Sequence, residues 1–113
     1  MSIAIQIAMT GAIAYEMPEL RPVLQEHLND YDGEVLPHLL LAEFVRAITA
    51  APLVPLAPQF WQWLEVAYAS GDDQVQELIV TGALEAIPAK DEPGHVPPSE
   101  LPPQLAEELS NLV

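Results

Sequence analysis

The densest group of side chains that could do chemistry surrounds residue 30. His27, Asp30, Asp32 and Glu34 offer nitrogen and oxygen donors, and Gly33 lies between two of the acids. Closely spaced carboxylates beside a glycine occur in calcium-binding loops, but the remaining spacing of an EF-hand loop is missing. A solvated turn explains the same pattern, because acids are favoured at the start of a helix by its dipole. We therefore predict no metal at this group.

Patterns for metal binding are weak elsewhere too. The other histidines, His38 and His95, share no short ligand spacing with His27 or with each other, and the chain has no cysteine. A chain without cysteine has no disulfide, thiolate ligand or thiol nucleophile. We therefore expect no tightly bound metal and no cofactor. The composition is compatible with the reducing cytoplasm, where we expect the protein to be.

Motifs for catalysis are equally scarce. The sequence contains neither a Gly-x-Ser-x-Gly nucleophile motif nor a glycine-rich phosphate loop. Glu43, Glu65 and Glu85 could act as a paired acid and base if folding brought them together, but glutamates that face solvent are far more common. These observations indicate a protein that is not an enzyme.

Two tryptophans are the most informative apolar residues. Trp61 and Trp63 are two positions apart, so on a helix they point about 200° away from each other. Trp61 shares a stripe with Leu64 and Tyr68, and we predict that it lies in the core. Trp63 is the better candidate for an interface anchor, since tryptophan is enriched at binding hot spots.

The elements that position these residues have the spacing of helices, and no segment alternates as a strand would. Prolines and glycines separate the segments. We predict an all-α fold, a single compact bundle of about five helices with residues 73–87 at its centre. There we expect Gly82 to allow close approach of a neighbouring helix. The segments with helical spacing, from which about five helices are expected, are residues 1–14, 17–30, 34–51, 59–70, 73–87 and 99–112.

The first segment is apolar, but it is not typical of a signal peptide or a membrane span. The first basic residue of the chain, Arg21, lies beyond the segment, and the segment is too short to cross a bilayer. Ser2, Gln6 and Thr10 recur every four residues and form one polar stripe on a helix. We interpret the segment as a mostly buried first helix.

The chain divides into a helical core over 1–88, a proline-rich loop over 89–98 and a last helix over 99–113, within one domain. The last helix is expected to dock on the core through its leucines, although the same face could bind another chain. The motif Asp-Gly-Glu-Val at 32–35 is echoed by Asp-Asp-Gln-Val at 72–75, forty residues later. Two HEAT-like helical pairs have this period, and repeated helix-start chemistry explains it equally well.

Charge is the strongest indication of the kind of partner. The sequence has three Lys and Arg residues and seventeen Asp and Glu residues, which gives a net charge of -14, and half of its residues are hydrophobic. Such a chain can bury a core, so it is not a disordered acidic tail. Its surface should repel nucleic acid and anionic membranes and attract basic partners. We expect neither nucleic acid nor a membrane as a partner.

Several segments together resemble a family of small, acidic, helical bacterial proteins associated with polymorphic-toxin immunity. The similarity covers roughly residues 15–87 and implies the fold, with no catalytic residues to transfer. It is carried by the segments 17–28, 33–39, 60–65, 71–75 and 82–86.

Charge and resemblance together predict an immunity protein, monomeric when free. It would bind a cognate toxin with a basic surface, which acts on nucleic acid, and block its substrate site. The alternative is a non-enzymatic regulatory or scaffold module that binds another protein through a helical face. No basic residue lies between Arg46 and Lys90. The candidate partner-binding residues are Asp30, Asp32, Glu34, Trp63, Glu65, Asp72, Asp73 and Glu77.

Overall fold

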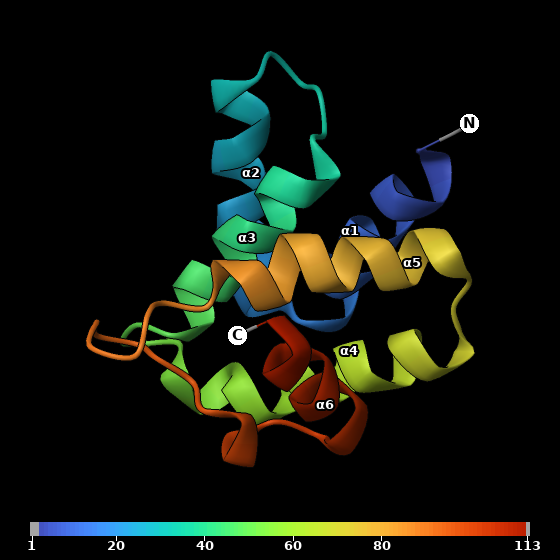
Figure 1. Cartoon of the computed structure of the whole chain (residues 1–113). Helices are drawn as coiled ribbons and strands as arrows, with labels where there is room; N and C mark the ends of the chain where they lie inside the picture. Colours follow the sequence, from blue (N-terminus) through green and yellow to red (C-terminus); the bar gives the residue numbers. More distant parts are fainter. Residues whose placement is uncertain (1–2, 113) are drawn as a thin grey trace.

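The computed structural model describes residues 3–112, and in that part of the chain the fold is all-α with no strand (Figure 1). The prediction of an all-α bundle is confirmed, and the number of helices is close to the one expected. The six α-helices are α1 (Ala4–Glu16), α2 (Arg21–Asp30), α3 (Pro37–Ile48), α4 (Ala57–Ser70), α5 (Asp73–Leu78) and α6 (Pro103–Leu112). None of the described helices is long and apolar enough to cross a membrane.

The core lies around α3, which packs against α1, α2 and the segment that follows α5. Leu40, Phe44 and Ile48 lie on one face of α3 and are fully buried. Trp61 on α4 is also buried, as predicted, with its ring edge-on to Phe60. Packing around these side chains joins helices that are distant in sequence.

The predicted central helix over 73–87 is regular only in its first part. After α5 the chain continues as a π-helical turn, Ile79–Ala83, and a 3-10 turn, Leu84–Ala86. Gly82 lies in the π-helical turn, where a Cβ atom would stand 3.4 Å from both the His38 carbonyl oxygen and Leu41 Cβ. Close approach of α3 therefore explains this glycine, as the sequence suggested.

The predicted start of the third helix near Glu34 is wrong. α3 begins at Pro37, where the missing N–H of proline costs nothing, because the first N–H groups of a helix have no partner within it. Glu34 is exposed in the connection before the helix and is therefore not in its first turn.

The prediction that the first helix is mostly buried is wrong, because only five of the 13 residues of α1 are buried. Its polar residues Gln6 and Thr10 are buried, whereas Ile5 and Tyr15 are exposed. The Thr10 hydroxyl donates to the Ile7 carbonyl, and the Gln6 amide reaches α5. Hydrogen bonds that satisfy these groups thus allow the polar stripe to face inward. Ser2 lies outside the described residues.

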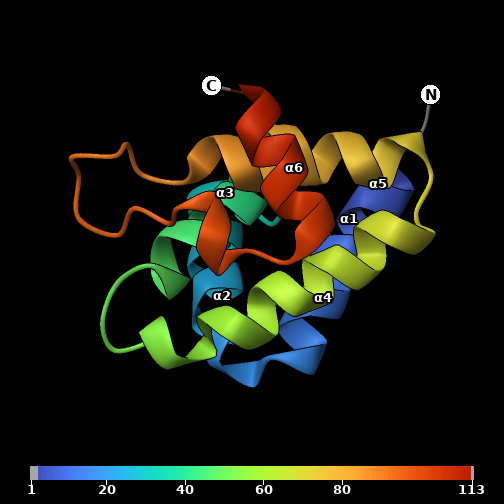
Figure 2. The ribbon, with the colours of Figure 1, turned by 60° about the horizontal axis from the view of Figure 1, so that its bottom comes forward.

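The last helix, α6, packs on α4 and on the 3-10 turn Leu84–Ala86 (Figure 2). Leu105 and Leu109 are buried there, so the leucine face is used within the chain. The exposed loop at residues 89–93 projects from the bundle, and the chain then packs back with Gly94 close to Thr49 and Val96 against the core. α6 thereby closes the bundle over α4.

Glu65 fixes the start of α6. This α4 residue is 9% exposed, and its carboxylate accepts hydrogen bonds from the backbone N–H groups of Gln104 and Leu105, each at 3.1 Å. The Tyr68 hydroxyl donates to Glu108 on α6 at 2.8 Å. This hydrogen bond raises the pKa of Tyr68 above its ordinary value. α4 and α6 are thus joined by polar contacts as well as by leucines.

Replacing Glu65 with alanine should lower the free energy of unfolding by about 2 kcal/mol, because two backbone N–H groups at the start of α6, of which that of Leu105 is buried, lose their acceptor. Urea unfolding followed by circular dichroism measures the loss. The exposed α6 residue Glu107 provides the control, and Glu107→Ala should change stability by less than about 0.5 kcal/mol. Equal losses in the two variants would contradict the capping role.

Candidate functional site

The first acidic group forms the turn between α2 and α3. Asp30, Asp32 and Glu34 are all exposed. Asp32 and Gly33 have φ angles of 55° and 82°, a left-handed conformation that aspartate and glycine tolerate best. Among residues 3–112, no three acidic or histidine side chains are placed to hold a metal ion together. The group is a tight, solvated turn with free carboxylates.

His27 supports this turn from inside. The side chain is buried, and its Nε2 accepts a hydrogen bond from the Leu36 backbone N–H at 3.1 Å. Its Nδ1 must then carry the proton, which it donates to Glu43 at 2.8 Å. Beside them lies a surface pocket of about 350 Å³, where Glu26 and Asp30 are partly balanced by Arg46. His27 therefore has a structural role that ties α2 to the start of α3.

The second acidic group lies where α4 passes into α5. Asp72 is the N-cap of α5, and its Oδ1 accepts from the N–H groups of Gln74 and Val75 at 3.0 and 3.1 Å. A Cβ atom at Gly71 would lie 2.6 Å from a Val75 methyl carbon, so only glycine fits this tight link. Asp72 and its neighbour Asp73 are consequently held as two exposed charges on rigid backbone.

An apolar groove of about 560 Å³ runs along the outer face of α4. Trp63 forms part of it and also packs partly against the core, whereas Val66 is 59% exposed. Ser70 lines the groove two residues before Asp72, so the groove ends next to the second acidic group. No charged side chain lines it. The lining residues are Gln59, Gln62, Trp63, Val66, Ala67 and Ser70.

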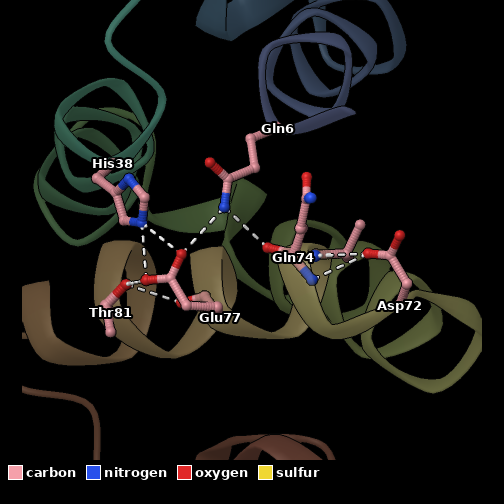
Figure 3. A network of polar contacts seen from close by, with 7 residues as sticks. Gln6, His38, Asp72, Gln74, Glu77 and Thr81 are labelled. Carbon is pink, nitrogen blue, oxygen red and sulfur yellow. Dashed lines mark hydrogen bonds and ion pairs between the residues drawn. The ribbon is translucent and has the colours of Figure 1, made fainter. Parts of the chain in front are cut away.

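Glu77 joins three helices through its carboxylate (Figure 3). It accepts hydrogen bonds from Thr81 Oγ1 at 2.6 Å, from Gln6 Nε2 at 3.0 Å and from His38 Nε2 at 2.8 and 2.9 Å. The Thr81 hydrogen bond is the largest cause that lowers the pKa of Glu77, and His38 and Gln6 act in the same direction. The Gln6 amide also donates to the Gln74 carbonyl oxygen at 2.9 Å. This network connects α1, α3 and α5.

The structure divides the predicted partner-binding residues. The α2–α3 turn and the α4–α5 link lie at separate places on the bundle, so the two acidic groups do not form one surface (Figure 1). Glu65 was predicted to bind a partner, but it is buried and its carboxylate accepts hydrogen bonds at the start of α6. Glu77 is half exposed, but its carboxylate already accepts hydrogen bonds from Gln6 and His38. Trp63, Asp72 and Asp73 remain together as one candidate site, which we call the α4–α5 corner.

The groove on α4 was missed in the sequence, although a signal for it exists. Residues 59, 62, 63, 66, 67 and 70 are spaced to form a second stripe on this helix, opposite to the one that contains Trp61. The role of Gln6 had no comparable signal, because its partners lie 68 and 71 positions away.

Replacing Glu77 with alanine should destabilise the fold by about 1 kcal/mol near neutral pH, a value reduced by the exposure of the pair with His38. A lowered pKa in the folded state means that this contribution is full above the ordinary value of 4.5 and is lost as the pH falls through the folded-state pKa. Urea unfolding at several pH values measures it. Glu85→Ala, at an exposed position, is the control and should have little effect at any pH. A Glu77→Ala effect that kept its full size at pH values where the folded-state Glu77 carboxyl is protonated would contradict the network.

Comparison with known proteins identifies a family without assigning an activity. The chain matches the family model described as Domain of unknown function (DUF7674) over residues 11–112, which extends from within α1 to the end of α6. No curated protein and no solved structure gives a significant match. Because the match covers nearly the whole chain, the protein belongs to the DUF7674 family of domains of unknown function.

Proposed function

We propose that the protein is a bacterial immunity protein, which binds a cognate toxin with a basic surface and blocks its substrate site. The observation that carries the proposal is that the negative charge of the acidic side chains is not neutralised by Lys or Arg side chains in the fold. The net charge is -14, and within residues 3–112 the close contacts of carboxylates with basic side chains involve only the histidines His27 and His38, which contact Glu43 and Glu77. Arg21 instead donates to the backbone oxygens of Ala14 and Tyr15. The surface therefore keeps most of its negative charge for a partner.

A toxin that acts on nucleic acid would complement such a surface. Enzymes of that kind need positive groups to hold phosphates, and an acidic protein competes for the same groups. Long-range attraction would also speed the encounter of the two proteins. The toxin would act in the bacterial cytoplasm, where we place the complex.

The α4–α5 corner is the contact site that the geometry supports best. It combines the capping carboxylate of Asp72 and the exposed carboxylate of Asp73 with the half-buried aromatic ring of Trp63. Charge speeds association, whereas an aromatic anchor in a groove contributes most to the lifetime of a complex. Because the backbone of the link is rigid, little conformational entropy would be lost on binding.

A second candidate function is a regulatory or scaffold module that binds an amphipathic helix. The observation that favours it is the uncharged groove on α4. The leucines of α6 do not support it, because they are buried in the bundle. Salt separates the two functions: binding to a basic toxin should weaken steeply as salt rises, and helix binding should change little.

The test uses Asp72→Asn and Asp73→Asn together, with the proteins encoded by the genes adjacent to this one as candidate toxins. Asparagine caps helices as well as aspartate, so the charge is removed while α5 keeps its N-cap. We expect slower association and weaker protection from the toxin. Trp63→Ala should instead accelerate dissociation, by roughly thirtyfold if the ring is worth about 2 kcal/mol. Biolayer interferometry measures both rates.

The matched control is Asp91→Asn with Glu107→Gln, which removes the same charge from exposed positions elsewhere on the chain. This control should alter association less than the corner variant does. A folded variant with all three corner changes that still protects fully would exclude the corner. If none of these adjacent proteins binds at any salt concentration, the immunity function itself fails.

A further inference from the structure

A pocket of about 340 Å³ lies where three segments that are distant in sequence meet. Its lining includes Ile48 at the end of α3, Trp61 of α4 and residues 94–96 of the loop before α6. Most of the lining side chains are apolar. Pockets of this size hold small molecules in many proteins, whereas one water takes up only about 30 Å³ of the liquid. The pocket is therefore large enough for an organic ligand.

The indole N–H of Trp61 lacks a hydrogen-bond partner in this part of the fold. Trp61 is 3% exposed, and its buried indole nitrogen has no acceptor within the described residues. An indole nitrogen can only donate, and buried polar atoms in native proteins nearly always have a partner. Because Trp61 lines the pocket, a ligand with an oxygen acceptor would supply the missing partner.

His95, which lines the same pocket from the loop, offers the opposite hydrogen-bonding role. Its Nδ1 lies 2.9 Å from the Pro88 carbonyl oxygen, which only accepts, so Nδ1 carries a proton and donates it. In the neutral ring Nε2 is then an acceptor, and it has no partner among residues 3–112. The pocket thus has a donor and an acceptor that are both unused. An amide group pairs with both, because its oxygen accepts and its N–H donates.

The loop that carries His95 is attached to the bundle by packing. Within the described chain, the hydrogen bonds of residues 88–96 join residues of this loop to one another. Gly94 instead packs beside Thr49, and Val96 packs against the core. A loop that shares no hydrogen bond with its surroundings can shift as a unit at low cost. Such a shift gives a ligand access to the buried indole nitrogen of Trp61.

We propose that this pocket binds a small, uncharged molecule with an apolar body and an amide group. The amide oxygen accepts from the Trp61 indole N–H, and the amide N–H donates to His95 Nε2. An anion is disfavoured, because Glu100 lines the pocket and the chain has a net charge of -14. A cation gains little, because Glu100 is exposed to water.

This inference is independent of the proposed function. No toxin takes part in it, and the pocket uses Trp61, whereas the groove next to the α4–α5 corner uses Trp63. The two side chains point in nearly opposite directions from α4. Failure of toxin binding would therefore leave the inference intact, and the reverse also holds.

Titration of the full, isotopically labelled chain with benzamide tests the proposal by nuclear magnetic resonance. Toluene has the same ring without the amide, and benzoate replaces the amide with a negative charge. We expect benzamide to move the Trp61 indole N–H signal downfield, in a saturable way, as the hydrogen bond forms. Benzamide should bind about tenfold more tightly than toluene, because only its amide pairs with the two polar groups. Benzoate should not bind.

Three results of this titration would overturn the proposal. They are a Trp61 signal that benzamide does not move up to its solubility limit, equal affinities for benzamide and toluene, and binding of benzoate as tight as that of benzamide. The Trp61 signal is identified by its loss in Trp61→Phe, so it cannot be confused with that of Trp63.

Two substitutions test the location of the site, with the backbone amide signal of Gly94 as the reporter. Trp61→Phe keeps an aromatic ring but removes the donor, and it should remove most of the preference for benzamide over toluene. Ala57→Leu fills the pocket and should weaken benzamide binding at least about tenfold. Ala69→Leu makes the same change at an exposed position of α4 and should leave binding unchanged.

Circular dichroism establishes that each variant is folded. An undiminished preference for benzamide in folded Trp61→Phe would exclude the indole N–H as the donor. Wild-type affinity in folded Ala57→Leu would exclude this pocket as the site. Should either variant fail to fold, the comparison of benzamide, toluene and benzoate on the wild-type chain still decides the proposal.

Discussion

The carboxylate of Glu77 is the contact on which the arrangement of the outer helices depends. It accepts hydrogen bonds from Gln6 on α1 and from His38 on α3, and it lies on α5 itself (Figure 3). A buried amide without a hydrogen-bond partner would cost about 1–3 kcal/mol. Gln6 can therefore face inward because Glu77 and the Gln74 carbonyl oxygen accept hydrogen bonds from its amide nitrogen. Together with the burial of Met9, Ile13 and Ala14, these hydrogen bonds account for the rotation of α1 that leaves Ile5 and Tyr15 facing solvent.

The acids of this chain fall into two physical classes that composition does not distinguish. Glu65 and Asp72 satisfy N–H groups at the starts of α6 and α5, and Glu43 and Glu77 pair with histidines. These acids stabilise the bundle. Asp73 and the acids of the α2–α3 turn accept no such hydrogen bond in the described contacts, and they contribute negative charge to the surface. The proposed toxin binding draws on this second class, with Asp72 contributing to both.

Periodicity in the sequence was enough for the fold class, for the burial of Trp61 and for the close approach at Gly82. Each of these follows from local spacing or from the size of one residue. The orientation of α1 did not follow, because its buried side combines Met9 and Ile13 with Gln6, whose hydrogen-bond partners lie 68 and 71 positions away. Burial of Glu65 was missed for the same reason, since its partners on α6 are 39 and 40 positions away. Long-range polar contacts explain both errors.

The rotation of α1 can be measured directly, because the chain has no cysteine and a single introduced thiol reports one position. Cysteine would be placed in turn at positions 8, 10, 12 and 13 of dilute, folded protein, and its labelling rate compared with that in urea. The orientation described above predicts rapid labelling at the exposed positions 8 and 12 and strong protection at the buried positions 10 and 13. Protection at 8 and 12 with rapid labelling at 10 would contradict it.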